Sequence, residues 1–156
     1  LVKNAIANQQ PTKTIFERIP RSIDAHPMIV TSKIEAWISN KEYLKAETEL
    51  RKQIPNNWNM ELILLYAELG DDKVNELSER TEKWLEDRPK DANLWLVASR
   101  LAQKDGLWSK AQQCIERSIE IRPASETYTE LALILSELGE KQQASEALKL
   151  ARQTSG

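Results

Sequence analysis

The fold of this chain is decided by residues 94–123, which read LWLVASRLAQKDGLWSKAQQCIERSIEIRP. Landmark residues of this stretch recur in the same order later in the chain, at a constant interval of 33 residues. A fixed period of this size is typical of stacked two-helix repeats rather than of a closed globule. The matched landmarks are Trp95 with Tyr128, Gly106 with Gly139, and Ala111 with Ala144.

The spacing inside this stretch predicts two helices separated by a turn. Trp95, Ser99 and Ala102 lie at positions i, i+4 and i+7, so they share one helical face. Gly106 suits the left-handed conformation that ends many helices, and Pro123 cannot continue the second helix. Small residues recur where two helices must approach closely, at Ser99, Ala111, Ser118, Ala132, Ala144 and Ala151.

The stretch resembles the tetratricopeptide pattern W-x2-L-G-x2-Y, then A-x3-F, then P, with conservative replacements. The matching residues are Trp95, Ala98, Ser99, Ala102, Ala111, Ile115 and Pro123. The resemblance implies an all-α fold, a right-handed superhelical α-solenoid of tetratricopeptide-like helix pairs.

We predict one tetratricopeptide array over residues 1–156, with about nine helices. Two weaker repeats lie upstream of the clear ones, because Ala46 and Leu50 match the spacing of Ala111 and Ile115. The expected parts are a leading helix at about 1–20 and repeats at about 24–55, 58–89, 91–123 and 125–154.

Composition narrows the class of protein. Charged residues make up 29% of the chain and are interleaved in sign, which is typical of solvated helix faces. The net charge of −2 argues against a nucleic-acid partner. The longest apolar run, residues 62–67, is far shorter than the roughly 20 residues of a membrane span. Because the chain starts at Leu1, we expect a fragment that lacks any N-terminal anchor.

The sequence offers little chemistry for catalysis or metal binding. His26 is the one histidine and Cys114 the one cysteine, whereas zinc and iron sites need several ligands. We interpret His26 as a surface residue, Cys114 as a partly buried inert thiol, and Asp71-Asp72 as a turn and helix cap. Phosphate-binding and hydrolase motifs are missing. We therefore predict no catalytic residues, no metal and no cofactor.

Five short runs carry a more specific resemblance. They are EKWL (82–85), RPKDA (88–92), LWL (94–96), LWSKA (107–111) and IRP (121–123). Upstream, Phe16, Ile19-Pro20-Arg21 and Leu64-Leu65-Tyr66 extend the similarity. Together these residues resemble the HemY family of bacterial haem-biosynthesis proteins, most strongly over about residues 80–125.

The resemblance implies a function and a location. It implies a parent protein with two N-terminal spans in the bacterial inner membrane, linked to late haem or porphyrin biosynthesis. It also implies protein partners, haem-biosynthesis enzymes among them, and no membrane contact except through the missing anchor. We favour the cytoplasmic side for this domain.

We expect the working surface on the first helix of each repeat, which lines the groove of tetratricopeptide arrays. Leu96, Arg100 and Lys104, at i, i+4 and i+8, are expected to form one exposed stripe, with Leu96 as a contact hot spot. The full set of predicted partner-binding residues is Thr31, Glu35, Ile38, Leu64, Glu68, Leu96, Arg100, Gln103, Lys104, Thr129, Leu133 and Ser136.

The leading hypothesis for function is a non-catalytic scaffold for protein–protein interactions. One alternative is a protein that carries porphyrin or haem, which would need an axial ligand such as His, Cys, Met or Tyr. Another is a generic tetratricopeptide adaptor unrelated to haem. An enzyme is the least favoured class, because the usual constellations of catalytic groups are missing.

Overall fold

The computed structural model describes residues 26–69 and 73–154. Within these ranges the chain forms eight α-helices and no strand, which confirms the all-α prediction. None of the helices in this part of the chain has the length and hydropathy needed to cross a membrane. The leading helix expected at about 1–20 and the turn expected at Asp71-Asp72 lie outside the described residues.

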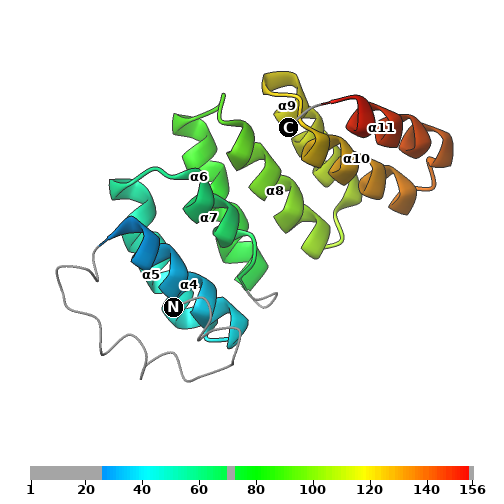
Figure 1. The fold of residues 1–156 in the computed structure, drawn as a ribbon. Helices are drawn as coiled ribbons and strands as arrows, with labels where there is room; N and C mark the ends of the chain where they lie inside the picture. The colour runs from blue at the N-terminus through cyan, green and yellow to red at the C-terminus, as the bar shows by residue number, and fades with distance from the viewer. Residues whose placement is uncertain (1–25, 70–72, 155–156) are drawn as a thin grey trace. The chain divides into compact units, whose positions relative to one another are not determined.

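The chain divides into two compact units, residues 1–70 and 71–156 (Figure 1). The first, the N-terminal unit, contains α4 (Pro27–Ser39), α5 (Tyr43–Asn56) and α6 (Met60–Tyr66). The second, the C-terminal unit, contains α7 (Val74–Asp87), α8 (Ala92–Lys104), α9 (Trp108–Ile121), α10 (Ser125–Glu137) and α11 (Lys141–Gln153). The division falls inside the predicted repeat 58–89, and one continuous array over 1–156 stays a prediction.

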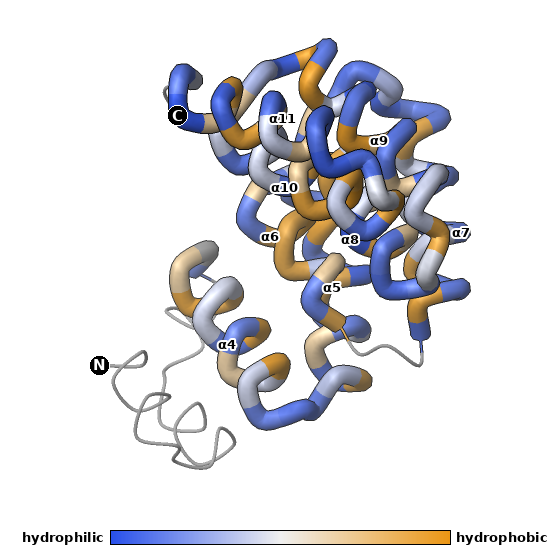
Figure 2. The backbone as a smooth tube through the Cα atoms, turned by 90° about the vertical axis from the view of Figure 1, so that its right-hand side faces the viewer, coloured by the Kyte–Doolittle hydropathy of each residue, from blue (hydrophilic) through white to orange (hydrophobic). Residues whose placement is uncertain are grey.

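Each helix of the C-terminal unit packs against the next one along the chain. Hydrophobic and hydrophilic residues alternate along these helices, so that each can bury one side (Figure 2). The last pair shows how the burial is built. Ala132 and Leu135 of α10 form a buried cluster with Ala144 and Ala147 of α11.

Small residues bring α8 and α9 into close contact, as their spacing predicts. Ser99, Ala111 and Ser118 are all buried. The Ser99 hydroxyl donates a hydrogen bond to the Ala111 carbonyl oxygen at 2.9 Å, and the Ser118 hydroxyl donates to the Ala92 carbonyl oxygen at 2.8 Å. A serine side chain reaches a neighbouring backbone only when the two helices are very near. Larger side chains at these positions would push the helices apart.

Among the described residues, three turns between consecutive helices share one geometry. Gly106 and Gly139 have φ of 73° and 81°, and Lys41 has φ of 60° in the corresponding turn between α4 and α5. In each turn the next residue donates its backbone N–H to the carbonyl oxygen five residues earlier, as in a Schellman helix end. These bonds join Leu107 to Ala102, Glu140 to Leu135, and Glu42 to Trp37.

The use of Lys41 in this turn is not signalled by the sequence, because lysine rarely adopts the left-handed conformation. Lys41→Gly is therefore expected to raise the free energy of unfolding by about 0.5–1 kcal/mol. Gly106→Ala is expected to lower it by about 1 kcal/mol. A Cβ atom at Gly106 would meet nothing within 4 Å, so this cost would come from the backbone alone. Urea unfolding measures both changes, and a destabilising Lys41→Gly would contradict the turn assignment.

Overpacking tests the close contact between α8 and α9. Ala111→Trp is expected to cost roughly 1–3 kcal/mol or more, because Ala111 is fully buried and its carbonyl oxygen holds the Ser99 hydroxyl. Gln113→Trp, at an exposed position of the same helix, serves as the matched control. An equal melting temperature for the two variants would show that the helix contact is misplaced.

Candidate functional site

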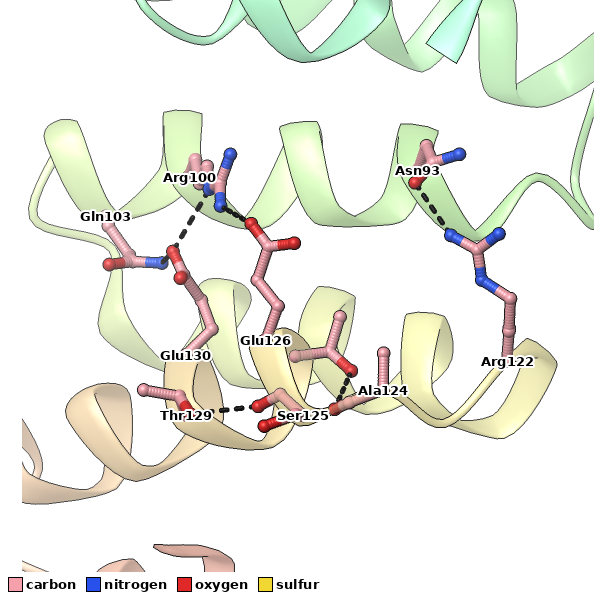
Figure 3. Close-up of polar contacts among 10 residues, drawn as sticks. Asn93, Arg100, Gln103, Arg122, Ala124, Ser125, Glu126, Thr129 and Glu130 are labelled. Carbon is pink, nitrogen blue, oxygen red and sulfur yellow. Dashed lines mark hydrogen bonds and ion pairs between the residues drawn. The ribbon is translucent and has the colours of Figure 1, made fainter. Parts of the chain in front are cut away.

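A polar network joins the first helices of the last two repeats (Figure 3). The Arg100 guanidinium on α8 pairs with Glu126 at 2.6 Å and with Glu130 at 3.3 Å, both on α10. The Gln103 amide donates a further hydrogen bond to the same Glu130 carboxylate at 3.0 Å. Glu130 is thus shared by two partners, which ties α8 and α10 together. The stripe of α8 that carries Arg100 and Gln103 therefore faces α10.

Leu96 lies one helical turn before Arg100 on this stripe, and only 3% of its surface is exposed. The prediction of an exposed hot spot at Leu96 is wrong. A helical pattern read from one helix does not reveal burial by the next repeat, which here places α10 beside α8. Trp95 is half-buried, and its indole N–H donates to the Pro89 carbonyl oxygen at 2.8 Å. Lys104 is exposed, as expected.

The predicted residues of the N-terminal unit differ in exposure. Thr31 is buried, which corrects the prediction that it faces outward from α4. Glu35, Ile38 and Leu64 are half-buried, and Glu68 is exposed. A pocket of about 380 Å³ between α4 and the start of α6 is lined by Thr31 and Glu35, together with His26, Met28, Ser32, Asn59 and Glu61. A groove that continues from these residues into the C-terminal unit stays a prediction.

The three remaining predicted residues, Thr129, Leu133 and Ser136, are all exposed on α10. They line an open pocket of about 510 Å³ between α10 and α11. We call this surface the α10–α11 face. Its residues are Thr129, Ala132, Leu133, Ser136 and Glu137 of α10, and Lys141, Ala144, Ser145 and Leu148 of α11.

The 33-residue period allows the α10–α11 face to be compared with its counterpart on α8 and α9. Leu148 corresponds to Ile115, and its exposed fraction is 40% where that of Ile115 is 0%. The exposed Thr129 corresponds to the buried Leu96. Leu133, with an exposed fraction of 53%, corresponds to Arg100, which α10 covers. The surface that one repeat uses to hold the next repeat is therefore open on α10 and α11.

Sequence reasoning missed the α11 half of this face because it considered only first helices. Shifting the inward residue Ile115 by one period would have identified Leu148. The acidic partners Glu126 and Glu130 were also missed. The sequence could have indicated them, because they lie about one repeat after Arg100 and carry the opposite charge.

Another pocket of the C-terminal unit, of about 370 Å³, lies between α7, α8 and α9. Trp95 and Cys114 line it, and an ion pair of 2.9 Å between Lys110 and Glu82 crosses its rim. Burial raises the pKa of the Cys114 thiol, although nearby Lys110 acts in the opposite direction. A thiol with a raised pKa stays protonated at neutral pH and is a weak nucleophile. The buried position agrees with the interpretation of Cys114 as a packed thiol.

Metal binding finds no support in the part of the chain that the structure describes. Over residues 26–69 and 73–154, His, Cys, Asp and Glu form no group of three or more that could hold an ion. His26 is exposed, and its Nδ1 accepts a hydrogen bond from the Met28 backbone N–H at 3.2 Å. The histidine thus caps the first turn of α4, a local role that the sequence analysis did not assign.

Comparison with solved structures places the fold among tetratricopeptide-like helical solenoids. MamA from Desulfovibrio magneticus RS-1 matches with a TM-score of 0.60 and 12% identity, over 97% of this chain and 89% of that chain. MamA MSR-1 matches with a TM-score of 0.59 and 14% identity, over 97% of this chain and 90% of that chain. Identities this low establish similarity of fold alone. No protein-family model and no curated protein sequence matches the chain.

The burial of Leu96 on α8 and the exposure of Leu133 on α10 predict different effects on stability. Leu96→Ala is expected to lower the free energy of unfolding by about 2–5 kcal/mol, because the side chain is buried. Leu133→Ala, at the exposed position on α10 that corresponds to Arg100, is expected to change it by no more than about 0.5 kcal/mol. Equilibrium urea unfolding followed by circular dichroism measures the difference. Similar losses for the two variants would refute the assignment of a covered face on α8 and an open face on α10.

Proposed function

We propose that this chain is a non-catalytic module for protein–protein interaction. The single observation that carries the proposal is the open α10–α11 face. Leu133 and Leu148 are exposed there on facing helices, around a pocket large enough for several side chains. Because both side chains are exposed, packing of the core of the C-terminal unit does not explain a leucine at either position. Contiguous exposed apolar surface of this kind commonly marks an interaction site.

The fold supports the same proposal. Tetratricopeptide-like solenoids present long helical faces on which partners bind. The chemistry of the described residues adds little toward an enzyme at Cys114, because burial raises the pKa of its thiol and the neighbouring Lys110 is paired with Glu82. Binding is therefore the activity that best uses the observed surface.

A finer proposal concerns the biological context. We propose that the chain acts with proteins of late haem or porphyrin biosynthesis, as a domain held at the bacterial inner membrane by segments outside this sequence. Its support is the resemblance to the HemY family in the runs EKWL, RPKDA and LWSKA. The alternative of a haem carrier gains no support from the one histidine or the one cysteine, because His26 caps a helix end and Cys114 is buried.

Capture of partners tests both levels of the proposal. The double variant Leu133→Glu, Leu148→Glu places two carboxylates on the face and is expected to reduce capture from a native membrane extract severalfold or more, because charges are costly in an apolar contact. The control is Leu150→Glu, whose side chain is 43% exposed on the same helix α11. Circular dichroism must show that all variants stay helical.

The proteins captured are identified by mass spectrometry. Equal capture by the double variant and by the control would exclude the α10–α11 face as the working surface. Capture that depends on the face but yields no enzyme of haem or porphyrin synthesis would leave the interaction module in place and overturn the finer proposal.

A further inference from the structure

The structure indicates what kind of molecule fits the α10–α11 face, because the same chain fills the equivalent face one repeat earlier. There the occupant is a helix, α10. On α10, Thr127, Glu130 and Ile134 lie at i, i+3 and i+7. Thr127 and Ile134 are buried, and Glu130 bonds Arg100 and Gln103. The equivalent face is thus built to accept one stripe of an α-helix.

The open face differs from its counterpart in charge on both of its helices, and these differences describe the occupant. At the end of α10, Glu137 replaces Lys104. Leu133 and Ser136 replace Arg100 and Gln103, so the face lacks the groups that bind the Glu130 carboxylate. An occupant with an apolar residue at that position would pack better on Leu133. The centre of the occupant stripe is therefore expected to be apolar throughout.

The second difference lies on α11. Lys141, Ser145, Leu148 and Arg152 follow at i, i+4, i+7 and i+11, so they form one stripe along the helix. Lys141 and Arg152, both exposed, stand at the two ends of this stripe. One period earlier the corresponding residues are apolar, Trp108 and Ile119. Cations at both ends favour an occupant that carries carboxylates at matching positions.

We propose that the α10–α11 face binds an amphipathic helix from another protein, with a central apolar stripe and acidic residues toward α11. The helix takes the place that α10 occupies on the preceding repeat. This inference rests on the proposed function and makes its partner specific. Recognition by an apolar stripe at i, i+3 or i+4, and i+7 is a known mode of helix binding in a hydrophobic groove.

A second copy of this chain is a poorer occupant on electrostatic grounds. A two-fold axis that pairs α11 with α11 would run the two helices in opposite directions. Lys141 of one copy would then meet Arg152 of the other at both ends of the contact. Like charges placed together across an interface disfavour the pair. The charge pattern that attracts an acidic helix therefore opposes self-association in this arrangement.

The direct test uses two synthetic peptides of about 16 residues, helical, fluorescently labelled and identical in their leucine stripe. One carries glutamates beside the stripe, and the other carries lysines at the same positions. We expect the acidic peptide to bind the intact chain more tightly than the basic one by about tenfold, and to bind more weakly as salt rises. Fluorescence anisotropy measures the dissociation constants.

Two variants decide whether this binding uses the proposed face. Leu133→Glu is expected to raise the dissociation constant of the acidic peptide about tenfold or more, whereas Leu150→Glu is expected to leave that constant unchanged. The double variant Lys141→Glu, Arg152→Glu is expected to reverse the preference, so that the basic peptide binds better. Such a reversal is not expected from general loss of stability, because a misfolded variant would lose both peptides.

Three outcomes would overturn the inference. One is equal affinity for the two peptides, and another is a preference that survives the charge reversal. The third is sedimentation of the intact chain as a dimer that Leu133→Glu converts to monomer, which would make a second copy the occupant. If the peptides fail while capture of proteins still depends on Leu133 and Leu148, the proposed function stands and only the helical, acidic nature of the partner is refuted.

Discussion

The C-terminal unit depends on how closely α8 and α9 approach each other. The Ser99 hydroxyl reaches the Ala111 carbonyl oxygen, and the Ser118 hydroxyl reaches the Ala92 carbonyl oxygen, so the two backbones are fixed at both ends of the pair. Buried hydroxyl groups without such partners would be costly, which makes the spacing specific as well as close. Because this pair is compact, its outer side can form an even surface on which α10 lies. The position of the next repeat is thus a consequence of small residues in the previous one.

Much of this architecture could be predicted from sequence, because it depends on local patterns. The 33-residue period locates the helix pairs, and Gly106 and Gly139 mark turns that need positive φ. Lys41 adopts the same conformation without any local signal, since lysine does not favour it. The turn between α4 and α5 is imposed by the packing of the two helices rather than by the residue at its centre. Conformational propensity identifies a turn position of positive φ only when the residue there is one that favours this conformation.

The candidate surface was less predictable, because exposure depends on the neighbouring repeat. Leu96 and Leu133 lie one helical turn apart in the repeat pattern, yet one is buried and the other is exposed. On α8 the neighbouring repeat bonds Arg100 and Gln103 of the same stripe through Glu130 of α10. A helical pattern reports which residues share a side, but it does not report what covers that side. Comparison of one repeat with the next supplies the missing information, since a covered position and its open equivalent have the same place in the helix pair but different neighbours.

The packing of α11 mainly against one helix has a consequence for how the C-terminal unit holds together. In stacked repeats, cooperativity passes between nearest neighbours, so a helix with one main neighbour is stabilised from one side. The main packing partner of α11 is α10, whereas α9 packs against both α8 and α10. Amide protons of α11 would then exchange with solvent through fraying openings that leave α8 and α9 intact. A ligand on the outer side would act as a missing neighbour and suppress those openings, so that binding and local order rise together.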